Sequence, residues 1–183
     1  MAFEFARTPF AFVVNARTDV SGVTSEEIVR IYRGEATRWP NGERVRLVLR
    51  PASDADTQLL RSISPEMSLA VGVAQARPGM LMAITNNECN EMVERTSGAI
   101  GPTSLLQVRA EAHALRLLAW NGVRPDLEAL ASGKYPLAKP LFLVIRRSPP
   151  PAVRGFVEYL ASPAAREILT SLGAQALPFP PVP

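Results

Sequence analysis

The sequence predicts an α/β fold in which helices cover both faces of a sheet. Short apolar segments typical of strands alternate along the chain with segments in which apolar residues recur at helical spacing. Several helical segments also begin with a capping residue that is followed by an acid or a proline. The 183 residues are 47% hydrophobic and 20% charged, which is enough to bury the core of one large domain or of two small lobes.

Five short apolar segments are expected to form strands. In chain order they lie at residues 10–15, 45–49, 99–101, 115–120 and 141–145. The last of them reads LFLVI and is typical of a strand that is buried on both faces. The segment at 80–85 is also apolar, but its pattern is ambiguous between strand and helix.

Capping residues mark the predicted helices. Thr24 and Glu27 form a capping box, and Gly34 ends the helix that follows them. Asp54 is the expected N-cap of a helix over residues 55–60, and Asn86 that of a helix ending at 94. The remaining helices are expected at residues 64–76, 125–132, 148–160 and 162–172.

The stretch from residue 44 to residue 60 is the candidate binding region. A buried strand, a short break and a helix N-terminus place free backbone N–H groups at the carboxyl end of a sheet, where open α/β folds bind small ligands and anions. Asp54 and Asp56 lie in that first helical turn. Their carboxylates either satisfy these amides or compete with an anionic guest, and the function depends on which of the two occurs.

Catalysis and metal binding have little support in the residue types. His113 is the single histidine and is expected to be exposed or to act as a cap, while Cys89 is the single cysteine and has no evident activating base. Asp54 and Asp56 are alternatively an acid–base pair or ligands for a hard cation, but helix capping is the favoured interpretation. We therefore expect no enzyme, no metal and no cofactor.

Charge and hydropathy exclude two further classes of partner. The net charge is +3, and the arginines of residues 30–50 alternate with glutamates without an aromatic ladder, so we expect no nucleic acid to bind. No apolar run reaches about 18 residues, so the sequence predicts no membrane span. The first ten residues, MAFEFARTPF, do not have the pattern of a signal peptide.

Several longer segments resemble the periplasmic phosphate-binding proteins of ABC transporters. VTSEEIVRIYRGEATRW at 23–39 is similar to the family's Leu-Thr-x-x-x-Leu helix and its "Phe-x-Gly-x-x-x-x-Trp" loop. The resemblance continues in order with the strand that ends at Arg50, with 96–105, with 117–144 and with 153–178. It therefore covers nearly the whole chain.

The resemblance implies a mixed sheet with helices on both faces, forming one lobe of a two-lobed binding protein of the type II periplasmic fold. Residues 1–145 would be the second lobe with its crossover strands. Residues 146–183 would be C-terminal helices and a proline-rich tail that belong to a first lobe lacking most of its residues. The two last helices would then pack on a second copy of the chain through their apolar faces, formed by Val153, Phe156, Val157 and Leu160 and by Ile168, Leu169 and Leu172.

The family's binding loop has Arg, three residues, and then Ser-Gly-Thr, whereas here Asp54, Ala55 and Asp56 follow Arg50. By resemblance, the ligand-binding residues are Arg50, Ser53, Asp54, Ala55, Asp56, Thr57 and Ser97. The implied function is non-catalytic binding of a small phosphate-like anion for the membrane subunits of an ABC transporter, in the periplasm. The alternative is an interaction or sensory module that has kept the lobe but not the ligand.

Overall fold

The computed structural model describes residues 1–179, and residues 180–183 of the predicted proline-rich tail lie outside the described residues. A mixed sheet organises the fold, with strands in the order β4-β3-β5-β1-β6. β3 is parallel to β4 and β5, whereas β1 is antiparallel to β5 and β6. These strands span Ala2–Asn15 (β1), Arg46–Leu49 (β3), Leu81–Met82 (β4), Ala99–Ser104 (β5) and Leu115–Leu117 (β6).

Helices cover both faces of this sheet, as the sequence predicts. On one face, α1 (Ser25–Arg33), α2 (Ala55–Ile63) and α3 (Pro65–Ala76) pack against a core that includes Phe12, Leu49 and Ile100. On the other face, α4 (Asn86–Arg95) and α5 (Leu105–Ala110) pack against Val13 and Val48. The alternation of side chains along each strand produces these two separate cores.

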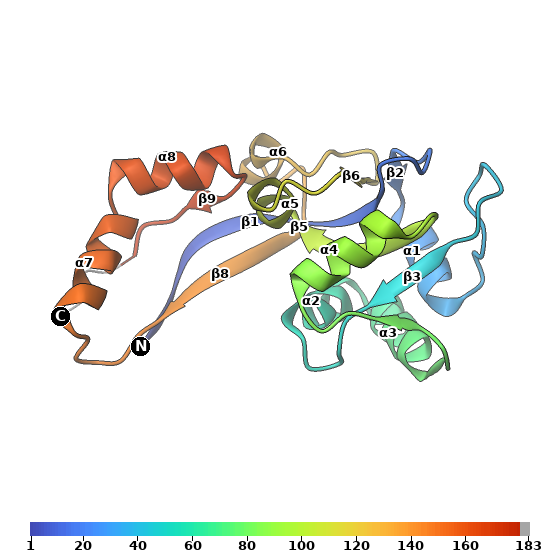
Figure 1. The fold of residues 1–183 in the computed structure, drawn as a ribbon, viewed down its shortest axis with the longest axis horizontal. Coiled ribbons are helices and arrows are strands. Elements are labelled where there is room, and N and C mark those ends of the chain that lie inside the picture. The colour runs from blue at the N-terminus through green and yellow to red at the C-terminus, as the bar shows by residue number, and fades with distance from the viewer. Residues whose placement is uncertain (180–183) are drawn as a thin grey trace.

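The remaining elements are a small second sheet and the strands and helices attached to the first half of β1. β2 (Gly22–Val23) and β7 (Ala119–Trp120) form a small parallel sheet, and α6 is Leu127–Ala131. β8 (Ala138–Val144) and β9 (Gln175–Ala176) both pair with β1, and α7 (Pro151–Leu160) and α8 (Pro163–Ser171) lie between them in the chain. Figure 1 shows β1 and β8 leaving the body together toward the end of the molecule that carries α7, α8 and β9.

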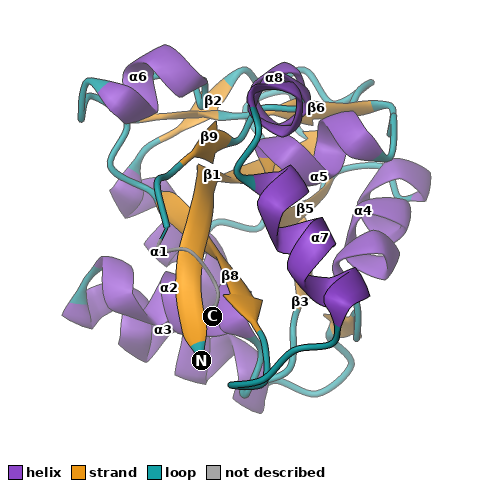
Figure 2. Ribbon diagram, turned by 90° about the vertical axis from the view of Figure 1, so that its left-hand side faces the viewer, coloured by secondary structure: helices purple, strands orange, loops and turns teal. Residues whose placement is uncertain are grey.

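We call this projecting part the arm, formed by residues 2–9 of β1 together with β8, α7, α8 and β9. The first half of β1 is paired with β8 from Ala2 opposite Val144 to Pro9 opposite Ala138, and the two strands lie side by side in Figure 2. β1 then enters the body, where Phe10 to Val14 pair with β5. One continuous strand therefore serves both parts, and the proposed division of the chain at residue 145 stays a prediction.

Local predictions are confirmed where a cap or a buried strand decides the structure. The capping box at Thr24 and Glu27, the left-handed Gly34 and the N-cap Asp54 are all present. Three predictions are wrong in detail. The cap of α4 is Thr85 rather than Asn86, because Thr85 and Glu88 form a reciprocal capping box. The strand predicted at 115–120 is broken at Leu118 into β6 and β7.

The third correction concerns the arm. β8 is not buried on both faces, because Phe142 is 58% exposed and Val144 is 73% exposed. The exposure of Phe142 and Val144 arises because β1 and β8 form a ribbon with only one further layer of helices, so part of its apolar surface has no covering layer among the described residues. On α7, Val157 is buried whereas Phe156 is 54% exposed, so part of the apolar face predicted for this helix has no cover within the described chain.

Candidate functional site

The loop between β3 and α2 carries most of the predicted site. Asp54 has extended backbone angles, and its Oδ1 accepts a hydrogen bond from the backbone N–H of Asp56 at 2.9 Å. This is the geometry of an N-cap, in which a side chain satisfies one of the free amides of the first helical turn. The favoured sequence interpretation of Asp54 as a capping residue is confirmed.

Arg50 lies at the carboxyl end of β3 and its side chain is only 4% exposed. Its Nη2 donates to Asp54 Oδ2 at 2.6 Å and its Nε donates to Asp54 Oδ1 at 3.3 Å, which is a two-point contact between guanidinium and carboxylate. Nη1 donates to the carbonyl oxygen of Ala83 at 3.2 Å. The carboxylate of Asp54 therefore lies against the guanidinium that an external oxyanion would need.

Asp56 makes the second ion pair of the site. It is 1% exposed, and its Oδ1 lies 2.5 Å from Nζ of Lys139, whose side chain is 13% exposed. Beyond this ion pair, neither carboxylate oxygen accepts a hydrogen bond from the described residues. Two opposite charges this close attract strongly in a buried setting. Lys139 lies on β8, so this pair joins the first turn of α2 to the arm.

Two cations and two carboxylates thus meet at the carboxyl end of β3, and their formal charges cancel. An anion is bound tightly where donors or positive charges are left over, as at a free helix N-terminus or an unpaired arginine. Here the arginine has a partner and one amide of the helix has a cap. Binding of an anion at this loop requires that Asp54 move away from Arg50.

The structure brings only some of the predicted residues together. Thr57 is buried and its Oγ1 donates to the carbonyl oxygen of Arg50 at 3.3 Å, while Ser53 and Ala55 lie exposed on the same loop. Ser97 lies elsewhere. It precedes β5, and the parallel register of Arg46 opposite Ala99 places it at the amino end of the sheet, where its hydroxyl donates to Glu43.

Two residues of this end of the sheet were missed by the sequence reasoning. The register of β3 and β5 carries Thr103 to the level of Arg50; Thr103 is 1% exposed and its Oγ1 has no hydrogen-bond partner among the described residues. The parallel strand ends were a usable signal for Thr103. Nothing in the local sequence pointed to Lys139, because its role depends on how β8 lies beside α2.

The single cysteine and the single histidine lie in surroundings that do not suggest catalysis. Burial raises the pKa of the Cys89 thiol to about 12, although the nearby charge of Arg50 lowers it, so this side chain is a neutral thiol at neutral pH. His113 was expected to be exposed or to act as a cap, and its side chain is only 10% exposed, with Nδ1 2.9 Å from Glu94 and Nε2 2.9 Å from Glu111. Within residues 1–179, no three His, Cys, Asp or Glu side chains are grouped as a metal site.

No helix in the part of the chain that the structure describes is both long and apolar enough to cross a membrane.

Comparison with known proteins identifies relatives for nearly the whole chain. A family model described as "PBP superfamily domain" matches residues 1–164. The phosphate-binding protein PstS of Borreliella burgdorferi is 20% identical over 176 residues, which cover 92% of this chain and 63% of the relative.

Solved structures share the fold. A protein from Clostridium perfringens, assigned as a phosphate ABC transporter substrate-binding protein and solved with bound phosphate, superposes with a TM-score of 0.79 at 16% identity, covering 97% of this chain and 72% of that one. An ABC-type phosphate transport receptor from Vibrio cholerae gives a TM-score of 0.67 at 23% identity, again covering 97% and 72%. The chain therefore spans less than two thirds of the Borreliella relative and nearly three quarters of these two structures.

Proposed function

Because this chain belongs to the PBP superfamily domain family, we propose that it is a non-catalytic solute-binding protein that takes a small phosphate-like oxyanion. The observation that carries the proposal is a buried arginine at the carboxyl end of a strand, directly before a helix N-terminus, in a chain whose relatives bind phosphate. Arg50 would contact the anion, with backbone amides of residues 53–57. Ser97 plays no part in this version of the site, since it lies at the other end of the sheet.

The state of Arg50 sets the expected affinity. An incoming anion must displace Asp54 from the guanidinium, and each of these charge-assisted hydrogen bonds is worth about 1.5–3 kcal/mol. Binding is therefore weaker than at an arginine that has no internal partner. A protonated oxyanion suits this loop better than a fully ionised one, because its O–H donates to a displaced carboxylate instead of repelling it.

Isothermal titration calorimetry with phosphate, sulfate and molybdate tests the proposal. We expect heat with at least one anion, loss of that heat in Arg50→Met, and no change in Arg46→Ala. Arg46 is the matched control, because it lies on the same strand but at the opposite end, where it donates to the carbonyl oxygen of Ser97. Absence of heat with all three anions, from a protein whose circular dichroism is that of a folded chain, would contradict the proposal.

The contact between Arg50 and Asp54 favours a second candidate function, an interaction or sensory module that binds no solute. In that case the carboxylate has permanently replaced the ligand as the partner of the guanidinium. Replacement of Asp54 by Ser and of Asp56 by Thr separates the two candidates. If the wild type binds no anion while this double variant does, the wild-type loop is closed by its own acids and the second candidate holds.

The proposed partners follow from the same family. They are the membrane subunits of an ABC transporter, with the periplasm as the location, and a second copy of this chain. The second copy is supported by the exposed apolar side chains of the two C-terminal helices, including Phe156 at 54% and Ile168 at 50%. Analytical ultracentrifugation over micromolar concentrations checks this part, and a single monomeric species throughout would contradict it.

A further inference from the structure

A large open cavity of the described chain lies away from the Arg50 loop. It measures about 840 Å³ and is lined by α1, by the facing ends of α2 and α3, and by residues 136–138, where β8 begins. This volume falls within the range of about 300–1,000 Å³ that is typical of sites for small organic molecules. None of the predicted anion-binding residues lines it.

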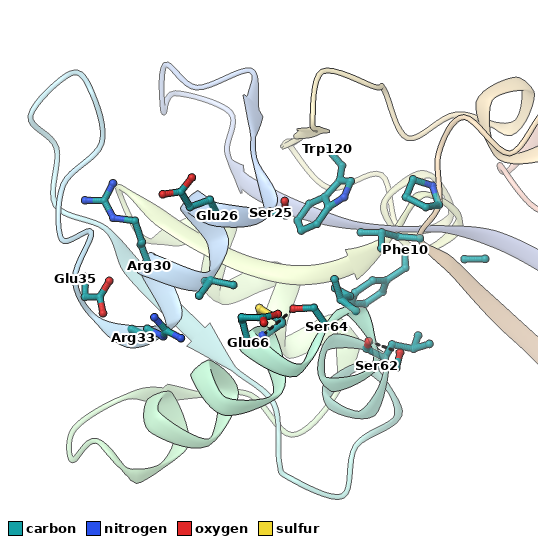
Figure 3. A pocket seen from close by; sticks show the side chains of 17 residues that line it. Phe10, Ser25, Glu26, Arg30, Arg33, Glu35, Ser62, Ser64, Glu66 and Trp120 are labelled. Carbon is teal, nitrogen blue, oxygen red and sulfur yellow. Dashed lines mark hydrogen bonds between the residues drawn. The ribbon is translucent and has the colours of Figure 1, made fainter.

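One side of the cavity is apolar and partly aromatic. Phe10 and Trp120 contribute rings, and Figure 3 shows both on the same side of the cavity. Leu59, Ile63 and Leu137 also line it and are only half-buried. Apolar groups that remain half-buried beside a cavity gain free energy when an apolar ligand excludes water from them. This side suits an aliphatic or aromatic body.

The other side of the cavity is charged, with both signs mixed. Arg30 and Arg33 project from α1 together with Glu26, and they lie opposite the aromatic side in Figure 3. Neither arginine has a carboxylate within 4.0 Å among the described residues. Glu35 and Glu66 complete the charged side.

Glu66 is held in its ionised form. The backbone N–H at the start of α3 and the hydroxyl of Ser64 hydrogen-bond its carboxylate, and with the positive charge of Arg33 they lower its pKa below the ordinary value. The charged side thus offers guanidinium donors to an anionic group and carboxylate acceptors to a cationic group, with two positive and three negative side chains. A ligand of one sign would meet repulsion as well as attraction here.

We infer that this cavity binds a small amphipathic zwitterion, in which an ammonium and a carboxylate are bonded to one carbon atom that also carries an apolar or aromatic body. The charged head group lies among the side chains of α1, and the apolar body lies against Phe10 and Trp120. The inference goes beyond the proposed function, because it concerns a different cavity and holds whether or not Arg50 binds an anion.

Calorimetry with three probes of nearly equal size tests this assignment. L-Phenylalanine carries both charges, 3-phenylpropanoate lacks the ammonium, and phenethylamine lacks the carboxylate. We expect phenylalanine to bind at least about tenfold more tightly than either analogue, since each analogue leaves a charged group of the protein without a partner. No heat with phenylalanine at millimolar concentration, or equal affinity for an analogue, overturns the inference.

Variants locate the site. Arg30→Ala should weaken phenylalanine binding roughly fivefold or more, because it removes a donor to the carboxylate. Leu59→Trp should abolish binding by filling the cavity, and Arg17→Ala, an exposed arginine outside the cavity, should leave it unchanged. Unchanged binding in both cavity variants overturns the assignment to this cavity. A phosphate titration of the same samples reports on the Arg50 loop separately, so failure at one site is distinguished from failure at the other.

Discussion

Replacement of Asp54 by Ser tests whether an internal carboxylate occupies the anion position of Arg50. The variant removes the charge that faces the guanidinium in two hydrogen bonds of 2.6 and 3.3 Å. Serine is itself a good N-cap, so the start of α2 keeps its cap and the change in helix capping is limited to a few tenths of a kcal/mol. The variant therefore isolates the loss of the ion pair.

The magnitude follows from the burial of the two partners. Removal of one member of a fully buried ion pair costs about 3–5 kcal/mol, because the other charge is left without compensation. The Asp54 side chain is 20% exposed while that of Arg50 is 4% exposed, so water reaches the vacated position and reduces the loss. We expect the free energy of unfolding to fall by about 2–3 kcal/mol in a buffer without multivalent anions.

Phosphate should then restore part of this stability. An anion that binds only the folded variant stabilises it by about 1.4 kcal/mol at ten times its dissociation constant. Urea denaturation followed by circular dichroism, with and without phosphate, measures both effects. Asp126→Ser is the matched control, since Asp126 caps α6 through the N–H of Ala129 and makes no ion pair among the described residues. Equal losses in the two variants, or equal stabilisation of wild type and Asp54→Ser by phosphate, would refute the reasoning.

Three further predictions concern other contacts. Lys139→Met should destabilise the fold by about 3–5 kcal/mol in urea denaturation, because Asp56 is then buried without a counter-ion. Adding Asp56→Leu to this variant should recover most of the lost stability. If it does not, the ion-pair explanation is contradicted. Burial lowers the pKa of His113, but its hydrogen bonds to the carboxylates of Glu94 and Glu111 outweigh burial and raise the pKa above the ordinary value. The stability that protonated His113 contributes is therefore complete below about pH 6.5 and is lost as the pH rises through the raised pKa. Denaturation at several pH values should show this loss in the wild type but not in His113→Gln. Gly98→Ala should lower the melting temperature, because its left-handed backbone and a neighbouring carbonyl oxygen leave no room for a Cβ; an unchanged melting temperature would show that the loop adapts.

Helix starts and buried strands could be predicted from the sequence because their causes are local. The capping box of Thr24 and Glu27 contains the donors and acceptors that begin a helix, and Ser64 followed by Pro65 adds a cap and a restricted backbone. Each of these two pairs begins a helix in the structure. The failure at Asn86 has the same origin. Thr85 and Glu88 are three residues apart and form the stronger, reciprocal cap, so the helix begins one residue earlier than predicted.

The candidate site was predictable only in part, since much of it depends on contacts between distant segments. Asp54 was correctly interpreted as a cap, because that role needs only its own helix. Its contact with Arg50 and the pairing of Asp56 with Lys139 depend on where strands and helices end in space. For the same reason the exposure of Phe142 could not be predicted, because an apolar run does not reveal whether a second layer covers it.

The pairing of β1 with β8 has a consequence for how the chain acquires its structure. Ala2 cannot pair with Val144 until all the residues between them have been made, and contacts this distant in sequence form slowly. The segment at 10–14, Phe-Ala-Phe-Val-Val, stays without its β5 neighbour until residue 104 has emerged. Such a segment readily joins foreign strands, so a nascent chain of this protein should depend on chaperones until β5 has emerged.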